Sequence, residues 1–135
     1  MSKQTYTGSC HCGAVRFEAD IDLSAGSGRC NCTICSKLRR WGTTIQPSDF
    51  RLLSGAEALS DYQFGGKVAH HRFCRHCGVH AFGDGYVEEI GGAYVSINLA
   101  CLDGVDPASL IEAPLRYFDG RNNDWFSTPA ETRHL

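Results

Sequence analysis

Seven of the eight cysteines stand in three short groups, and this arrangement constrains the fold more than any other feature of the chain. Thiols separated by one or two residues are too close for ordinary disulfide bridges within a group, but they suit two bonds to one metal ion. Thiolates are soft ligands that bind zinc well. The sequence therefore predicts a chain that folds around metal held by Cys10-His11-Cys12, Cys30-Asn31-Cys32-Thr33-Ile34-Cys35 and Cys74-Arg75-His76-Cys77.

The three groups divide most simply into one complete site and one incomplete site. The two outer pairs together supply four thiolates, which is the full ligand set of a structural zinc site. The middle group supplies only three, so its metal would either take a fourth ligand from elsewhere, such as a distant residue or a neighbouring subunit, or keep a position for water or substrate, as catalytic sites do. We therefore expect two zinc ions per chain, one bound by Cys10, Cys12, Cys74 and Cys77 and the other by Cys30, Cys32 and Cys35.

An even number of cysteines also permits a disulfide framework. The first residues, Met1 to Tyr6, lack the apolar core of a secretion signal, and a cytosolic chain keeps its thiols reduced. No apolar run reaches the roughly 18 residues that a membrane helix needs. We therefore expect a cytoplasmic protein that does not enter a membrane and whose thiols bind metal.

Length and charge narrow the classes of function. The chain has 135 residues, the length of one domain, so we expect residues 1–135 to form a single zinc-binding domain. Its formal net charge of −2 counts cysteine as neutral, and binding two zinc ions to seven thiolates would bring it to about −5. Nucleic-acid binding depends on basic residues that displace counterions from the phosphates. We therefore do not expect a nucleic-acid partner for a chain with this negative charge.

Short β-rich runs between turn residues predict an all-β fold with few helical turns. Val15, Phe17 and Ala19 alternate with polar residues, as in a half-buried strand. Gly65-Gly66 between two such runs predicts a hairpin. The expected strands lie within 4–20 on both sides of a turn, and at 43–46, 50–53, 59–64, 67–73, 79–82, 93–99 and 115–118, with loops at 24–28 and between 82 and 93. Short helical turns are expected at 36–40 and 106–110, and Trp125 with Phe126 would anchor the tail.

Three stretches in this order resemble the glutathione-dependent formaldehyde-activating enzyme family, which includes the centromere protein V relatives. They are Gly8-Ser9-Cys10-His11-Cys12-Gly13-Ala14-Val15-Arg16-Phe17, the six residues from Cys30 to Cys35, and Phe73-Cys74-Arg75-His76-Cys77-Gly78. The resemblance covers roughly residues 6 to 126. One departure is Asn31, where many members carry histidine.

The resemblance implies an all-β, tent-like fold clamped by zinc. It implies that Cys10, Cys12, Cys74 and Cys77 hold a structural zinc ion and that Cys30, Cys32 and Cys35 hold a catalytic one. The activity it implies is that of a carbon–sulfur lyase, which condenses formaldehyde with glutathione to S-hydroxymethylglutathione. The partners would then be a small thiol and a small aldehyde.

Two roles are open for a metal held by three cysteines. It could hold the thiol of glutathione as a thiolate, or it could polarise the carbonyl oxygen of the aldehyde. Three thiolate ligands donate much negative charge and blunt the Lewis acidity of the ion. We therefore favour thiol capture.

Basic residues close to the middle group are candidates for binding the two carboxylates of glutathione. Lys37, Arg39 and Arg40 follow Cys35, and arginine matches carboxylates in a fork geometry. Trp41 would cover an apolar part of the ligand. The plainer interpretation is a solvated basic turn.

The remaining candidates have a structural interpretation beside a functional one. His70 and His71 should face opposite sides of a strand, and we expect both to be structural rather than catalytic. Cys101 is expected to be a small buried hydrophobe. The functional alternative for Cys101 is the redox thiol of an enzyme resembling zinc-bearing methionine sulfoxide reductases, although their active-site stretch has no match here.

A further alternative for the whole chain is a non-catalytic interaction module with two structural zinc ions. The oligomeric state is left open.

Overall fold

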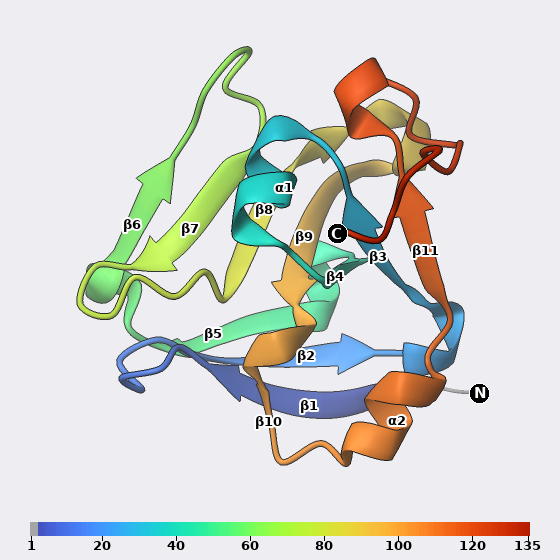
Figure 1. Cartoon of the computed structure of the whole chain (residues 1–135). Coiled ribbons are helices and arrows are strands. Elements are labelled where there is room, and N and C mark those ends of the chain that lie inside the picture. Colours follow the sequence, from blue (N-terminus) through green and yellow to red (C-terminus); the bar gives the residue numbers. More distant parts are fainter. Residues whose placement is uncertain (1–2) are drawn as a thin grey trace.

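The computed structural model describes residues 3–135, and most of its regular structure is β-strand (Figure 1). Two short α-helices, α1 (Thr33–Leu38) and α2 (Pro107–Glu112), and several single turns of 3-10 helix connect the strands. The strands are β1 (Gln4–Ser9), β2 (Arg16–Ile21), β3 (Ser27–Cys30), β4 (Gly42–Ile45), β5 (Phe50–Ser54), β6 (Leu59–Tyr62), β7 (His70–Cys74), β8 (Phe82–Val87), β9 (Gly92–Asn98), β10 (Leu102–Asp103) and β11 (Leu115–Phe118). The expected mainly-β fold is confirmed.

The strands form two sheets that enclose the core between them. A four-stranded sheet has the order β10-β1-β2-β5, and a seven-stranded sheet has the order β11-β3-β4-β9-β8-β7-β6. In Figure 1 the first sheet runs across the base of the molecule, and the strands of the second rise from it. Neighbouring strands are antiparallel except β11, which is parallel to β3. This one parallel pair brings the C-terminal part of the chain beside the strand that ends at Cys30.

The core lies where the inward face of β2 meets β9 and β8. Phe17 is fully buried, as the alternation along residues 15–19 predicted, and so is Ile97 on β9. The ring of Phe50 lies 5.7 Å from that of Phe17 and 4.6 Å from that of Phe82, so three aromatic side chains join the two sheets. Gly8 contacts the Phe17 ring directly, and a side chain at this position would displace it.

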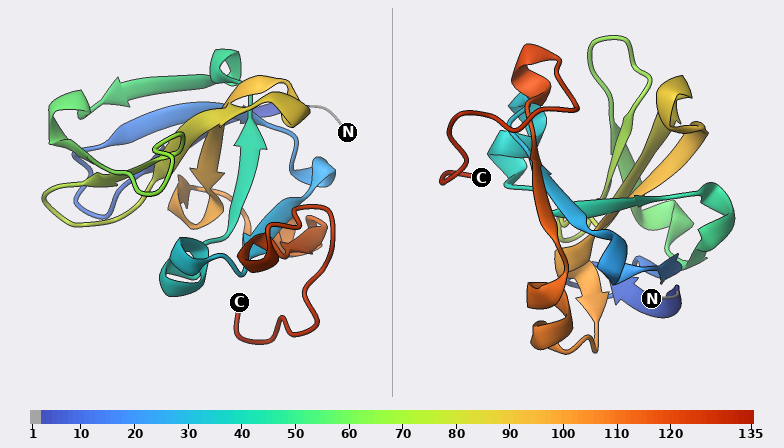
Figure 2. Two further views of the ribbon diagram at one scale, coloured as in Figure 1. Left: turned by 90° about the horizontal axis from the view of Figure 1, so that it is seen from above. Right: turned by 90° about the vertical axis from the view of Figure 1, so that its right-hand side faces the viewer.

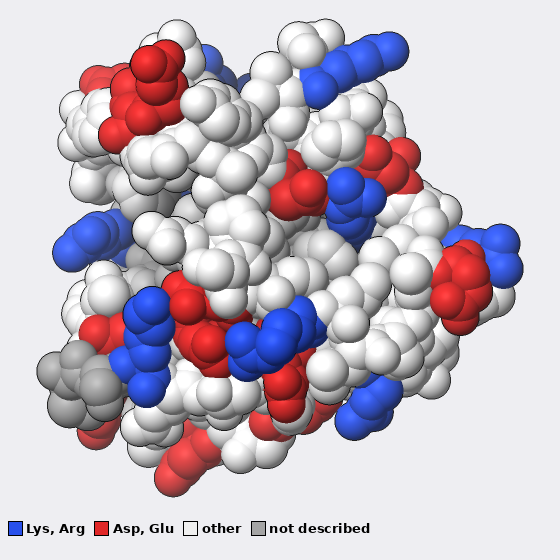
Figure 3. All heavy atoms as spheres, turned by 180° about the vertical axis from the view of Figure 1, so that it is seen from behind, with Lys and Arg blue, Asp and Glu red and all other residues white. Residues whose placement is uncertain are grey.

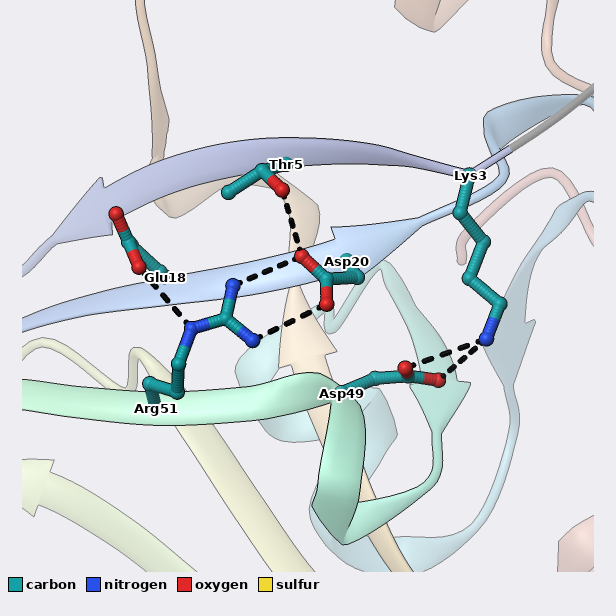
Figure 4. A network of polar contacts seen from close by, with 6 residues as sticks. All are labelled: Lys3, Thr5, Glu18, Asp20, Asp49 and Arg51. Carbon is teal, nitrogen blue, oxygen red and sulfur yellow. Dashed lines mark hydrogen bonds and ion pairs between the residues drawn. The ribbon is translucent and has the colours of Figure 1, made fainter.

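An ion-pair network fastens the outer face of the smaller sheet (Figure 4). Arg51 on β5 bridges to Glu18 at 3.0 Å and to Asp20 at 2.8 Å, both on β2. Thr5 on β1 donates a hydrogen bond of 2.7 Å to the same Asp20 carboxylate. These contacts link three adjacent strands, and the hydrogen bonds from Arg51 and Thr5 lower the pKa of Asp20 to about 2.

The surface carries mixed charge. Figure 3 shows Lys and Arg side chains interspersed with Asp and Glu over the back of the molecule, without a continuous basic stripe. Within residues 3–135, none of the helices is long and apolar enough to cross a membrane.

Two expected helical features are wrong in position. Helix α1 begins at Thr33 instead of residue 36, because Cys32 caps it and the Ser36 N–H donates to the Cys32 carbonyl at 2.9 Å. It ends at Leu38 instead of residue 40, because Arg39 has a left-handed backbone with φ of 51°. Cys35 is therefore a helical residue.

Three expected β-features also differ. The stretch expected as an acidic loop is strand β8, and residues 79–81 precede it. Gly83 and Gly85 lie within this strand, where closely packed neighbours leave no room for a side chain. A Cβ on Gly85 would lie 2.6 Å from the Tyr94 hydroxyl. β3 begins at Ser27, inside an expected loop. The tail is not anchored by Phe126, whose side chain is 88% exposed.

Candidate metal centre

The four-cysteine cluster joins the two sheets at one end. One pair lies in the turn between β1 and β2, and the other lies at the end of β7 and in the turn after it. The Sγ atoms of Cys10 and Cys12 are 3.7 Å apart, and those of Cys12 and Cys74 are 3.6 Å apart. Four thiolates at about 2.3 Å around a tetrahedral zinc ion would be separated by about 3.8 Å. The cluster of Cys10, Cys12, Cys74 and Cys77 therefore has the donor set and spacing of a metal site.

Glycines shape the two turns that carry these thiols. Gly13 follows the first pair with φ of 82°, and Gly78 follows the second with φ of 77°. In this left-handed region a side chain is strained, so glycine is the fitting residue. The Gly13 N–H donates to the Cys10 carbonyl at 3.2 Å, and the Gly78 N–H donates to the Cys74 carbonyl at 2.7 Å. Each turn thereby holds its two thiols on the same side.

Without a bound metal ion, the four thiols differ in pKa. Backbone N–H groups of Cys12 and Val79 lower the pKa of Cys77 to about 6. The Ala14 N–H lowers the pKa of Cys12, but desolvation and proton sharing with Cys74, Cys10 and Cys77 together outweigh it and raise this pKa to about 11. Four adjacent negative charges repel one another, so a bound cation is needed to hold all four thiols as thiolates.

The three-cysteine cluster forms where β3 passes into α1. Cys30 is the last residue of β3, Cys32 caps the helix, and Cys35 lies in its first turn. All three side chains are partly buried, and their Sγ atoms lie within 4.8 Å of one another. Among the residues that the structure describes, no fourth His, Cys, Asp or Glu ligand atom joins this cluster.

In the three-cysteine cluster, electrostatics favour Cys32 as the thiolate in the absence of a cation. The Cys30 and Cys35 thiols donate hydrogen bonds that lower the pKa of Cys32 to about 2. The same sharing with Cys30 and Cys32, together with burial, raises the pKa of Cys35. A divalent ion would reverse this order, because it stabilises every thiolate that binds it.

A basic hollow of about 250 Å³ lies at the C-terminal end of α1. Trp41 forms one wall and is fixed by a hydrogen bond of 2.8 Å from its Nε1 to Ser27 Oγ. The Arg29 guanidinium lies 5.6 Å above the Trp41 ring, in a cation–π contact. No acidic side chain is part of its lining, which consists of Arg29, Leu38, Arg39, Arg40, Trp41, His80, Asn98 and Ala100.

Arg40 connects this hollow with the three-cysteine cluster. Its two terminal nitrogens donate to the Oγ and the carbonyl oxygen of Ser96, both at 2.9 Å. None of the ion pairs among residues 3–135 involves Arg40. Burial lowers the pKa of its guanidinium, and the charges of Cys35 and Tyr94 oppose this shift. The side chain is therefore a half-buried cation that is held by Ser96 and has the Cys35 thiol and the Tyr94 phenol in its surroundings.

The other residues singled out from the sequence lie as follows. Lys37 is exposed on α1 and does not line the hollow. His70 is held by Asp61, with 2.6 Å between Nδ1 and the carboxylate, whereas the ring of His71 stacks on Phe64 at 5.5 Å.

Cys101 is buried, and its Sγ donates to the His80 carbonyl at 3.8 Å. Burial raises the pKa of its thiol to about 11. It is therefore a protonated core residue, as its structural interpretation predicted.

Sequence reasoning missed part of the site. Ser96 and Asn98 come from β9, and His80 precedes β8, so no local pattern connects them with the cysteines. Burial and the positive charge of Arg40 lower the pKa of His80. Arg29 directly precedes Cys30, and this adjacency was the one signal available.

The fold and the two clusters together define a class of mainly-β proteins with a four-cysteine and a three-cysteine site that can hold metal ions. Residues 5–115 match the sequence profile of a family described as "Glutathione-dependent formaldehyde-activating enzyme", and the chain belongs to this family. The resemblance found in the sequence is thus confirmed.

Two similar proteins illustrate the relationship. A provisionally named glutathione-dependent formaldehyde-activating enzyme of Halomonas elongata is 40% identical over 60 residues, which are 42% of this chain and 38% of the relative. The match therefore spans well under half of that relative's length. A crystal structure of a Rhodobacter sphaeroides protein is 38% identical with a TM-score of 0.67, and the match covers 81% of this chain and 98% of that one.

Proposed function

We propose that this chain is a zinc-dependent enzyme of the carbon–sulfur lyase type, which adds a thiol such as glutathione to a small aldehyde at the three-cysteine cluster. One observation carries the proposal. The fold brings Cys30, Cys32 and Cys35 together without a fourth ligand from the described residues, whereas the other cluster is complete with four thiols. A ligand set of this kind leaves a position for an incoming molecule.

Zinc suits the donor atoms of both clusters, which are all thiol sulfurs within 4.8 Å of one another. When bound at the three-cysteine cluster, it would supply a thiolate at neutral pH by lowering the pKa of a thiol that joins it. Cys30, Cys32 and Cys35 themselves bring three negative charges to the site. Their charge favours the capture of a thiol over the polarisation of a carbonyl group.

The basic hollow supports a thiol that carries carboxylates. Arg29, Arg39 and Arg40 converge on it, and none of the described ion pairs involves them. A guanidinium group binds a carboxylate through two parallel hydrogen bonds. Arg40 also lies near Cys35, so it would orient the anionic end of the ligand while the thiol end reaches the cluster. Lys37 has no part in this arrangement.

The reaction requires no further reagent. The thiol sulfur forms a bond to the aldehyde carbon as the C=O π bond breaks, and the proton lost by the thiol ends on the new hydroxyl group. Holding the two reactants in the correct geometry is the main contribution that a protein makes to such an addition.

Exchange NMR on glutathione and formaldehyde tests the proposal. The zinc-loaded protein should interconvert them with S-hydroxymethylglutathione faster than the protein-free solution does. Cys32→Ser should lose this acceleration, and Cys101→Ala should keep it, because Cys101 lies outside both clusters. Two bound zinc ions without any acceleration over the protein-free reaction would contradict the proposed activity.

A non-catalytic interaction module with two structural metal ions is the second candidate. The observation in its favour is that Gly120 lies against both Cys30 Sγ and the Trp125 ring, so the chain covers one side of the cluster. Cobalt in place of zinc distinguishes the two, because its absorption reports the number of sulfur ligands. Addition of millimolar glutathione should change the spectrum if a ligand position is available, and an unchanged spectrum would favour the module.

A further inference from the structure

Asn31, which lies between two cysteines of the three-cysteine cluster, is bonded on several sides by a segment near the C-terminus. Its side-chain nitrogen donates to Asp119 Oδ1 at 2.8 Å. Its side-chain oxygen accepts from the Arg121 N–H at 2.9 Å, and its backbone carbonyl accepts from Arg121 Nε at 3.0 Å. The Asn31 N–H donates to the Phe118 carbonyl at 3.2 Å. Every polar group of Asn31 therefore has a partner about 90 residues away in the chain.

The same segment packs directly on a thiol of the cluster. A Cβ added to Gly120 would lie 2.6 Å from Cys30 Sγ and 2.5 Å from the Trp125 ring. Glycine is therefore required here by close approach. Both views of Figure 2 place this C-terminal segment beside α1, the helix that carries Cys35.

Residues 119–125, named here the C-terminal strap, hold their own shape. The Asp124 N–H donates to the Asp119 carbonyl at 2.9 Å, and Trp125 Nε1 donates to Asn123 Oδ1 at 3.0 Å. Asp119 also accepts a side-chain hydrogen bond of 2.9 Å from Asn122. The strap thus reaches the cluster as an internally bonded turn that Asn31 fixes in place.

We propose that the C-terminal strap is a wall of the three-cysteine metal site and that Asn31 is the positioning residue that fastens it there. The strap would limit the escape of the metal ion and the access of competing ligands on the side of Cys30. The family match ends at residue 115, so the strap lies outside the part of the chain that it covers. The inference rests on the metal ion of the proposed function and is independent of the reaction.

The expected size of the effect follows from other metal sites. Groups that contact metal ligands without binding the metal typically change its affinity by about 10- to 100-fold when they are replaced. Here the Asn31–Asp119 hydrogen bond keeps Gly120 against Cys30, so loss of either partner should loosen the same wall.

Zinc transfer from the two-zinc protein to a chromophoric chelator measures this directly. One zinc ion should leave the wild-type protein from the three-cysteine site and the other more slowly from the four-cysteine site. Asn31→Ala and Asp119→Ala should each speed the first phase by about 10-fold or more and leave the second phase unchanged. Asp119→Ala is the cleaner variant, because it changes the strap and leaves the ligand-bearing turn intact.

A double-mutant cycle tests whether the two residues act through one contact. If they do, the two effects should be clearly less than additive, since the shared bond is lost only once, although Asn31 also bonds Arg121 and Asp119 also bonds Asn122. Phe126→Ala is the matched control. Phe126 follows the strap and its side chain is exposed, so this variant should release zinc at the wild-type rate.

Wild-type release rates in Asp119→Ala, or additive effects in the double variant, would overturn the inference even if the protein accelerates the thiol–aldehyde reaction. Faster zinc release in a protein without that activity would uphold the inference and count against the proposed function alone.

Discussion

Cys12 Sγ lies 3.6 Å from Cys74 Sγ, although 62 residues separate them in the chain. Cys12 belongs to a turn of the smaller sheet, whereas Cys74 ends a strand of the larger one. A metal ion bound between them would therefore join the two sheets in addition to their shared aromatic core. In the unfolded chain these ligands are not assembled, so the binding free energy contributes to folding.

The first prediction is that the purified protein contains two zinc ions per chain under reducing conditions. Each cluster brings together enough thiol sulfurs to bind one ion. Elemental analysis of protein prepared without added metal gives the ratio. A ratio of one that persists after zinc supplementation would exclude the second site and the enzymatic proposal with it.

The second prediction separates the two clusters by their effect on stability. Cys74→Ser should lower the free energy of unfolding by at least about 3 kcal/mol, because it opens the clamp between the sheets. Cys32→Ser should cost much less, since its cluster lies within a continuous stretch of chain and leaves the clamp intact. Thermal and urea denaturation of both variants measure this. Equal losses would show that both metal ions are structural.

The third prediction concerns the dependence of stability on pH. Arg51 and Thr5 lower the pKa of Asp20 to about 2 in the folded protein, whereas an unfolded aspartate has a pKa of about 3.9. A lowered pKa stabilises the fold above the unfolded value, and this contribution is lost as the pH falls through the folded value. The stability difference between the wild type and Arg51→Gln should therefore be largest at neutral pH and shrink below about pH 4.

Urea denaturation across this range measures that difference, and metal loss in acid affects both proteins alike. Arg133→Gln is a suitable control. Arg133 pairs with Glu131 only two residues away, a contact that the unfolded chain also permits, so its removal should change stability little. A difference for Arg51→Gln that stays constant with pH would contradict the role assigned to Asp20.

The parts of the structure that could be predicted from the sequence depend on local spacing. The division of the cysteines follows from short intervals within each group, and the alternation of Val15, Phe17 and Ala19 places one face of β2 in the core. Residues that act over a few positions leave a readable pattern.

The parts that could not be predicted depend on partners far along the chain. Ser96 meets Arg40 only because β9 pairs with β4, and Asp119 meets Asn31 only because β11 is parallel to β3. Strand β8 was expected as a loop because its glycines are poor strand formers in general, and the close approach of Tyr94 that requires Gly85 is a tertiary contact.

The fourth prediction tests the basic hollow as the binding site for a carboxylate. Arg40→Gln should weaken glutathione binding by about 10-fold, because it removes a charge-assisted pair with the ligand. The same substitution should change the affinity for a glutathione diester little, because both carboxylates of this ligand are esterified and carry no charge. Titration of the cobalt-substituted protein measures both affinities. Lys37→Gln is the matched control, since Lys37 is exposed outside the hollow and its loss should leave glutathione binding unchanged.

Equal weakening of both ligands by Arg40→Gln would contradict this assignment. It would show that Arg40 serves the cluster itself, where it would balance the charge of Cys35 and Cys32.

The last prediction concerns Cys101 and the redox alternative. Its side chain is only 8% exposed, and burial followed by the charge of Asp103 raises the pKa of the thiol to about 11. A free cysteine has a pKa of about 8.5, so at neutral pH the reactive thiolate should be more than about 100-fold rarer here. Iodoacetamide should therefore label Cys101 in the folded, zinc-loaded protein far more slowly than in the unfolded, metal-free chain, as mass spectrometry of the peptides would measure. Cys101→Ala should also keep the exchange activity, because the thiol lies in the core and outside both cysteine clusters, with a hydrogen bond to the His80 carbonyl. Rapid labelling of Cys101 in the folded protein, together with lost activity in Cys101→Ala, would instead indicate a redox enzyme that uses this thiol.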